Sequence, residues 1–173
     1  MKQDIENCCL ARVTEIMERE KDNLYRYACY RLGSPEEAED LLQDLYLAMH
    51  SKRSVLRNVD RLDSYIYRSL SNACTSRLRS RSRRRFVDET ALRGLAADDA
   101  APDRFEREFL RIDRMLALLP AEQSETIRLR IHGGRSFAEI AEIVEAPVAT
   151  VKSRYRYGIA KLREAGAADE LSD

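Results

Sequence analysis

The sequence predicts an all-α chain made of two small helical domains joined by a linker. Apolar residues recur at a spacing of three or four through most of the 173 residues, which is typical of amphipathic helices. Only six glycines and four prolines are present, too few for an all-β chain with many tight turns. The predicted domains are residues 1–85 and 107–173, separated by an acidic linker at residues 86–106.

The first domain is expected to begin with a long helix from Leu10 to Leu32 that ends at Gly33. Ser34 then predicts the N-cap of a second helix, with Pro35 at its first position and Glu37 completing a capping box. The apolar residues expected to face the core from these two helices are Leu10, Val13, Met17, Leu24, Ala28, Leu32, Ala38, Leu41, Leu42, Leu45 and Met49.

Residues 51–60 are basic and show no clean period, so we expect a loop there. A third helix is predicted from Leu62 to about Ser80, which would complete a small three-helix core. Its apolar stripe is Leu62, Ile66, Leu70 and Ala73, and its polar stripe is Tyr65, Arg68, Asn72, Ser76 and Arg79.

The second domain ends in a pattern that predicts a helix-turn-helix. A helix from near Glu106 to Pro120 and another over residues 121–132 come first. Ser136 is expected to cap a short helix, and residues 145–147 break the chain before a last helix to about Ala165. Ala141 would allow close approach of the two helices, and Val151 would fill their shared core.

A helical wheel divides the last helix into two faces. The residues expected to face inward are Val148, Val151, Tyr155, Ile159 and Leu162. The outward face has small residues, hydroxyls and cations, which suit contacts to base edges and phosphates. It comprises Ala149, Ser153, Arg156 and Tyr157, with Thr150 and Lys152 on its flanks and Arg154 and Lys161 placed for phosphates.

Charge is unevenly distributed although the formal net charge is zero. Residues 49–85 hold 11 basic and 2 acidic side chains, and residues 126–165 hold 8 basic and 4 acidic ones. The blocks before and between them are acidic. Two basic patches are what two nucleic-acid contacts would need, although chance clustering on solvated helices gives the same pattern.

The four cysteines and two histidines form no zinc-binding spacing, so no metal and no cofactor is expected. Cys29 lies in an apolar pattern and is predicted to be a buried thiol. The acidic N-terminus is unlike a signal peptide, and no apolar run approaches the roughly 18 residues that span a membrane. We therefore expect a cytoplasmic protein without membrane insertion.

Several motifs together resemble extracytoplasmic-function (ECF) RNA polymerase sigma factors of the sigma-70 superfamily. FAEIA, TVKSR and KLR at residues 137–163, preceded by LLPAEQSETIRLRIHGGRS, resemble sigma region 4. LYRYACYRLGSPEEAEDLLQDLYLAMH and SYIYRSLSNACTSRLR resemble sigma region 2. The resemblance covers roughly residues 20–85 and 108–165. It implies that region 2 binds core polymerase and melts the promoter −10 element, and that region 4 reads the −35 element.

The resemblance also implies roles for individual residues. Glu39, Asp40, Gln43 and Asp44 would bind core RNA polymerase. The loop at 51–61, the polar stripe and the arginines of residues 77–85 would hold the separated −10 strand, through Arg53, Arg57, Asn58, Arg61, Tyr65, Arg68, Asn72, Arg77 and Arg79. Thr150, Lys152, Ser153, Arg154, Arg156 and Tyr157 would contact the −35 element. Two roles stay open, since Tyr65 either stacks on a base or packs in the core, and Asn72 either contacts DNA or braces its helix.

The sequence departs from the family pattern at two places. Glu145 stands where the turn of the helix-turn-helix usually has Gly, so the turn must accept a left-handed or altered geometry. Tyr157-Gly158-Ile159 replaces a common R-A-R, which removes two cations and places a Gly in a helix at a cost of about 1 kcal/mol.

The sequence thus predicts a sigma factor that directs RNA polymerase to specific promoters and has no enzymatic activity of its own. Its expected partners are core RNA polymerase, promoter DNA and an anti-sigma factor, and the free chain is expected to be a monomer. The alternatives are a stand-alone helix-turn-helix regulator, which would need a dimer and a palindromic site, and a helical adaptor protein.

Overall fold

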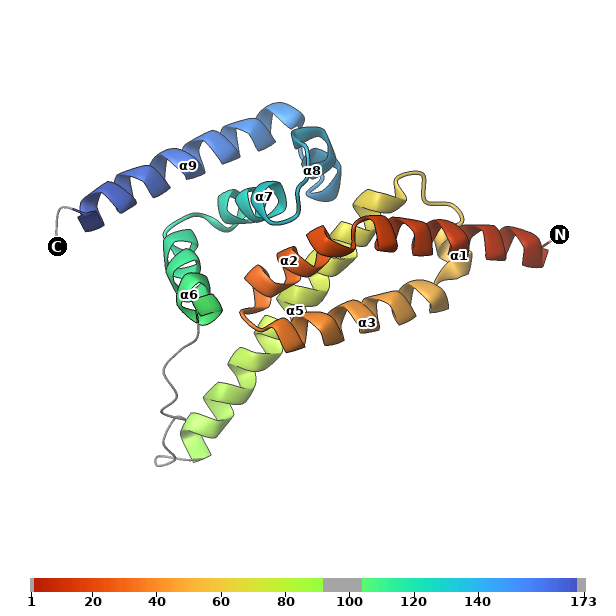
Figure 1. Ribbon diagram of the computed structural model, residues 1–173, viewed down its shortest axis with the longest axis horizontal. Helices are drawn as coiled ribbons and strands as arrows, with labels where there is room; N and C mark the ends of the chain where they lie inside the picture. Colours follow the sequence, from red (N-terminus) through yellow and green to blue (C-terminus); the bar gives the residue numbers. More distant parts are fainter. Residues whose placement is uncertain (1, 92–103, 171–173) are drawn as a thin grey trace.

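The computed structural model describes residues 2–91 and 104–170, and every element in these ranges is a helix (Figure 1). The all-α prediction is therefore confirmed. The side chains of residues 2–9, 53, 85–91 and 166–170 are outside the description, as are residues 92–103 of the predicted linker. The adjacent Cys8 and Cys9 thus remain undescribed, whereas Cys29 is buried as predicted and Cys74 is buried too.

The N-terminal module consists of five helices, α1 to α5. Helix α2 packs against α3 and α5, and α3 also packs against α5, so these three elements enclose the core. Tyr27, Ile66 and Leu70 have no accessible surface there. The elements are α1 (Lys2–Arg19), α2 (Lys21–Leu32), α3 (Pro35–Ser51), α4 (Arg53–Leu56) and α5 (Leu62–Ala91).

The prediction of one continuous helix from Leu10 to Leu32 is wrong, because the chain turns at Glu20 between α1 and α2. Glu20 has φ −96° and ψ 5°, yet its N–H still donates to Ile16 O and its own carbonyl accepts from Leu24. The hydrogen-bond ladder and the apolar stripe both continue across the turn. The spacing of apolar residues in the sequence therefore does not indicate the break between α1 and α2.

The start of α3 agrees with the predicted N-cap, but the predicted capping box is incomplete, since among the described residues no bond returns from the Ser34 N–H to the Glu37 carboxylate. Gly33 adopts φ 74°, the left-handed conformation that ends α2, and Ser34 Oγ accepts a hydrogen bond from the Glu37 N–H at 3.2 Å. The expectation of a loop at residues 51–60 is corrected in part, because α4 makes one helical turn that buries Leu56. Helix α5 begins at Leu62 as predicted but continues beyond Ser80 to Ala91.

The C-terminal module contains α6 (Arg104–Ala117), α7 (Ala121–Ile131), α8 (Phe137–Ile143) and α9 (Val148–Glu170). Ser136 and Glu139 form a complete capping box at the start of α8, each side chain bonding the other residue's N–H. Ala141 and Val151 are buried where α8 meets α9, as a helix-turn-helix requires. Val148 was expected to face inward but is 40% exposed, because it begins α9 at the outer edge of this contact.

The two modules pack directly on each other. Helix α7 contacts α2, and α8 contacts α5. Leu129 and Ile140 from the C-terminal module are fully buried in the same apolar cluster as Tyr27 and Tyr67 from the N-terminal module. Figure 1 shows the result, with α3 and α9 at opposite outer edges and α7 and α8 resting on α2 and α5.

Gly158 has a packing role that the sequence did not reveal. It is buried in α9, and a Cβ atom at this position would lie 2.7 Å from Ile127 Cδ1. The side chains of Gln123 and Leu119 would be 3.5 Å away. The absence of a side chain at Gly158 therefore permits the close approach of α9 to α7, at the expense of helix propensity.

We predict that Gly158→Leu destabilises the protein by about 1–2 kcal/mol, because overpacking this contact outweighs the gain in helix propensity. Ala160→Leu is the matched control, since Ala160 is exposed on the same helix. Urea denaturation of both variants measures the difference. Equal stabilities for the two variants would show that α9 does not depend on this approach.

Candidate nucleic-acid interface

The outer face of α9 is open to solvent. Thr150, Lys152 and Arg156 are exposed, while Ser153 and Arg154 are half-buried. Tyr157 is 55% exposed, and the guanidinium of Arg156 lies 5.1 Å from the centre of its ring. The six residues expected to read the −35 element thus lie on one helix of the helix-turn-helix, and they form a surface of cations, hydroxyls and one aromatic ring.

The turn before α9 has the left-handed geometry that the sequence suggested. Glu145 has φ 53°, a conformation that favours glycine. Its carboxylate Oε1 accepts a hydrogen bond from Arg68 Nη1 at 2.6 Å, so the strained residue contacts the other module. A glycine in this turn could not form that ion pair.

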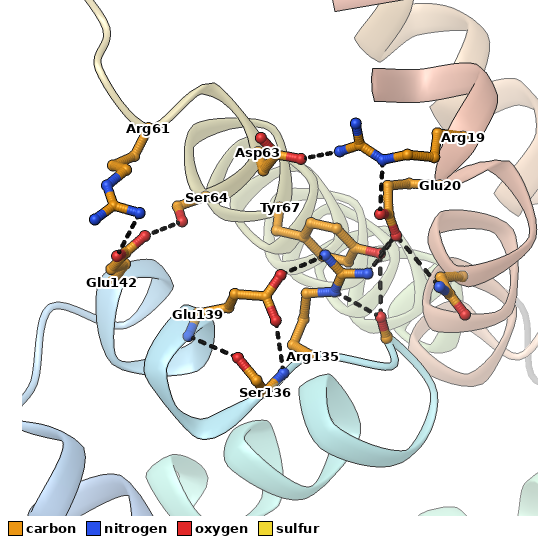
Figure 2. A network of polar contacts seen from close by, with 12 residues as sticks. Arg19, Glu20, Arg61, Asp63, Ser64, Tyr67, Arg135, Ser136, Glu139 and Glu142 are labelled. Atoms are coloured by element: carbon orange, nitrogen blue, oxygen red, sulfur yellow. Dashed lines mark hydrogen bonds and ion pairs between the residues drawn. The ribbon is translucent and has the colours of Figure 1, made fainter. Parts of the chain in front are cut away.

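The polar stripe of α5 is partly covered by α8. Arg68 Nε donates to the carbonyl oxygen of Ile143 at 3.1 Å, and its Nη2 donates to that of Glu142 at 2.5 Å. Ser64 Oγ donates to Glu142 Oε2 at 2.7 Å, and Arg61 Nη1 lies 3.3 Å from Glu142 Oε1. Two cations expected to hold the −10 strand, Arg61 and Arg68, are therefore engaged by the C-terminal module (Figure 2 shows Arg61, Ser64 and Glu142).

The other residues expected to hold the −10 strand are spread along the N-terminal module. Arg57, Asn58, Asn72 and Arg79 are exposed, whereas the side chain of Arg53 lies outside the described residues. Tyr65 is half-buried and packs against the core, so only part of its ring is available for stacking.

Arg77 joins two of the predicted surfaces. Its Nη2 lies 2.8 Å from Asp44 Oδ2, and its Nη1 donates to the carbonyl oxygen of Glu37 at 3.0 Å. An arginine assigned to DNA thus pairs with an aspartate assigned to polymerase. These two assignments meet at the groove between α3 and α5.

The acidic face of α3 is open. All four residues expected to bind polymerase are exposed there, namely Glu39, Asp40, Gln43 and Asp44. Leu47, one turn beyond Gln43, is 65% exposed although it is large and apolar. An apolar groove with polar edges lies alongside, between α3 and the α1–α2 pair, and its lining includes Met17, Tyr25, Leu42 and Leu47.

A buried ion pair that no sequence pattern indicated joins the modules (Figure 2). Arg135, 6% exposed, binds the carboxylate of Glu20 through Nη2 and that of Glu139 through Nη1. Its Nε donates to Gly133 O at 2.9 Å, and its guanidinium lies 4.6 Å from the centre of the Tyr67 ring. Burial raises the pKa of Tyr67, which remains a neutral donor to Gly133 O.

A second carboxylate at the interface belongs to the C-terminal module and contacts the N-terminal module. Glu125 on α7 accepts hydrogen bonds from Tyr27 Oη at 2.5 Å and from Ser71 Oγ at 2.8 Å. Arg31 Nε lies 3.7 Å from its other oxygen. Burial and the Glu125 charge raise the pKa of Tyr27 well above its usual value. The C-terminal module therefore places two charged side chains, Arg135 and Glu125, against polar groups of the N-terminal module.

An aromatic stack completes the contact between the modules. The rings of Tyr30 and His132 lie parallel, with centres 4.1 Å apart and an angle of 8° between their planes. His132 is buried, and Arg128 and Arg26 add positive charge nearby, so its pKa falls to about 4. The imidazole is therefore neutral at physiological pH.

Comparison with known proteins identifies both modules. Residues 16–84 match the family model described as sigma-70 region 2, and residues 109–162 match the one described as sigma-70 region 4. The ECF RNA polymerase sigma factor SigM of Mycobacterium tuberculosis is 30% identical over 152 residues, which cover 86% of this chain and 74% of the relative.

This chain belongs to the ECF family of RNA polymerase sigma factors. The ECF sigma factor SigW of Bacillus subtilis is 27% identical over 162 residues, covering 87% of this chain and 86% of the relative. Like its family, this sigma factor acts in promoter-directed transcription initiation, which is the function that the sequence motifs predicted.

Two solved structures share the fold. The sigma factor RpoE in complex with the anti-sigma factor NepR from Bartonella quintana matches with a TM-score of 0.61 and 21% identity, over 89% of this chain and 93% of that one. CnrH in complex with the cytosolic domain of CnrY matches with a TM-score of 0.66 and 17% identity, over 95% and 96% of the two chains. In the described part of the sigma factor, no helix is long and apolar enough to cross a membrane.

We predict that His132 titrates near pH 4, well below a free histidine. Because the folded state lowers this pKa, the unfolded state binds more protons between pH 6.5 and 4, and stability falls as the pH drops through that window. NMR titration of the imidazole measures the pKa, and His132→Phe should retain the stack on Tyr30 while flattening the pH dependence of stability. A His132 pKa near 6.5 would contradict the packing.

Proposed function

We propose that this sigma factor divides promoter recognition and polymerase binding among three surfaces, two of which adjoin at Asp44 and Arg77. The observation that carries the proposal is that the helix-turn-helix presents an exposed, cationic α9, while α3 presents an exposed, acidic face on the other module. These surfaces have opposite charge and lie at opposite edges of the molecule (Figure 1). They can therefore bind different partners at the same time.

The acidic surface of α3 is assigned to core RNA polymerase. Glu39, Asp40, Gln43 and Asp44 supply carboxylates and an amide that suit basic groups on the enzyme. Leu47 and the adjacent apolar groove add a hydrophobic contact beside these polar residues. An acidic rim around an apolar centre gives such a surface both specificity and affinity.

The −10 element is assigned to the polar stripe of α5 and the segment before it. Arg57, Asn58 and Arg61 would hold the strand at the start of α5, and Tyr65 would offer the exposed part of its ring to an unpaired base. Farther along the same helix, Arg68, Asn72, Arg77 and Arg79 would follow the phosphates, and Arg53 would contribute from the start of α4.

The −35 element is assigned to the outer face of α9. The helix enters the major groove in this arrangement, with Ser153, Arg156 and Tyr157 nearest the base edges. Thr150, Lys152 and Arg154 lie on its flanks and would contact the backbone. This distribution separates base readout from phosphate binding.

The sigma factor would contribute no catalytic chemistry of its own, since polymerase carries out RNA synthesis, and it would act in the cytoplasm as a monomer before it binds the enzyme. An anti-sigma factor is the expected regulatory partner. The sigma factor RpoE from Bartonella quintana, which shares this fold, is in complex with the anti-sigma factor NepR, and this supports the assignment.

Run-off transcription with core polymerase and a genomic promoter library tests the function. We expect specific transcripts only when the chain is present, and copurification of the chain with the core enzyme. Association with DNA as a stable dimer, without any transcript, would instead favour a stand-alone regulator.

Two double variants test the assignment of surfaces. Asp40→Ala with Gln43→Ala should weaken binding to core polymerase about tenfold or more, because both residues lie on the α3 surface. Lys152→Ala with Arg156→Ala should leave that binding intact and reduce −35 duplex binding, with a weaker dependence on salt. Arg107→Ala, an exposed cation on α6, is the control for lost charge. Equal effects of all variants in both assays would overturn the assignment.

A further inference from the structure

The C-terminal end of α8 rests on a row of three hydrogen-bond donors on the N-terminal module. Arg61, Ser64 and Arg68 are spaced three and four residues apart, so they share one side at the start of α5. Ser64 and Arg68 donate hydrogen bonds to α8 or to the turn after it, and Arg61 forms an ion pair with Glu142, at distances of 2.5–3.3 Å. The row holds the Glu142 and Glu145 carboxylates and the carbonyl oxygens of Glu142 and Ile143.

The groups that this row binds have the chemistry of a nucleic-acid backbone. Two guanidinium groups and a hydroxyl are common donors to phosphate oxygens. Carboxylates together with the carbonyls at a helix C-terminus offer negative charge and acceptor oxygens in the same place. The end of α8 therefore occupies the donors in the way that phosphates of a DNA strand would.

The ion pairs of Arg61 and Glu145 at the two ends of the row are exposed and hence weak, whereas Ser64 is buried beneath α8. The side chains of Arg61 and Glu145 are 75% and 73% exposed, and that of Arg68 is 37% exposed. Ion pairs this accessible to water contribute little to stability and are screened by salt. A strand of DNA with several phosphates can therefore compete with them once the modules begin to separate.

The other two surfaces are not covered in the same arrangement. The α3 face and the outer face of α9 are both exposed, and neither helix lies between the modules (Figure 1). The packing of the modules thus affects the proposed strand-binding surface selectively.

We propose that the end of α8 acts as an internal substitute for the DNA backbone, occupying Arg61, Ser64 and Arg68 and blocking single-stranded DNA until the modules separate. This inference rests on the proposed function, since it assumes that the α5 stripe binds the −10 strand. Glu142 and Glu145 are the residues that compete with the strand. Neutralising them should weaken the cover over the strand-binding row without any change to the row itself, while the carbonyl oxygens of Glu142 and Ile143 stay in place.

Fluorescence anisotropy of a labelled 20-nucleotide oligo-dT with the full chain, at low salt and without polymerase, tests the proposal. Glu142→Gln with Glu145→Gln should bind the strand about tenfold more tightly than the original chain, because two competing charges are lost. Glu122→Gln with Glu164→Gln removes the same charge from exposed positions of the same module and should change affinity much less. Circular dichroism and thermal unfolding establish that both variants are folded.

Adding Arg68→Ala to the Glu142→Gln, Glu145→Gln variant should abolish most of the gain. The proposal is overturned if the original chain already binds oligo-dT as tightly as that variant, if the control gains equally, or if the gain persists without Arg68. Run-off transcription with core polymerase is a separate readout. If the variant binds oligo-dT more tightly but no transcripts form, the proposed function is refuted. The inference that α8 covers the row would still stand.

Discussion

The arrangement of the molecule depends on the ion pair between Glu20 and Arg135. Both side chains are nearly buried, 11% and 7% exposed, and each belongs to a different module. Removing two charges from water is unfavourable unless their remaining hydrogen-bonding groups also find partners. Glu139, the Gly133 carbonyl and the Tyr67 ring supply these partners to Arg135, and Asn23 donates a further bond to Glu20. The hydrogen-bonding groups of both side chains therefore find all these partners in one relative position of the modules.

That position determines which surfaces face solvent. The Glu125 carboxylate and the Tyr30–His132 stack lie on the same side of the N-terminal module as the ion pair, so α2 and α5 become internal while α3 stays outside. The helix-turn-helix meets α5 through α8, which leaves α9 free. The surfaces proposed for polymerase and for the −35 element thus lie on different modules, whereas those proposed for polymerase and the −10 strand meet at Asp44 and Arg77.

Local features were predictable from the sequence because their causes are local. The Ser34 and Ser136 caps, the Gly33 terminus, the left-handed Glu145 and the buried pair of Ala141 and Val151 each depend on neighbours within a few turns. The turn at Glu20 was missed because the apolar stripe continues across it. The short α4 was missed because a single turn is too short for a period to appear.

The contacts between the modules could not be predicted in this way. Arg135 and Glu20 are 115 residues apart, and both resemble ordinary solvated charges in amphipathic helices. The motifs located the surfaces assigned to polymerase and DNA, but they did not show that Arg61 and Arg68 would be paired with α8 or that Arg77 would be paired with Asp44. Gly158 departs from the family pattern, and its role became clear only from the structure, in which Ile127 lies against it.

A double-mutant cycle on Glu20→Gln and Arg135→Met, followed by urea denaturation of the full chain, tests most directly whether this pair holds the modules together. Each single change leaves a buried group without its charged partner and should cost about 3–5 kcal/mol. The double variant should lose less than the two single losses combined, with a coupling energy of about 2 kcal/mol or more. Additive effects within about 0.5 kcal/mol would contradict the account, because they would mean that Glu20 and Arg135 do not interact across the interface.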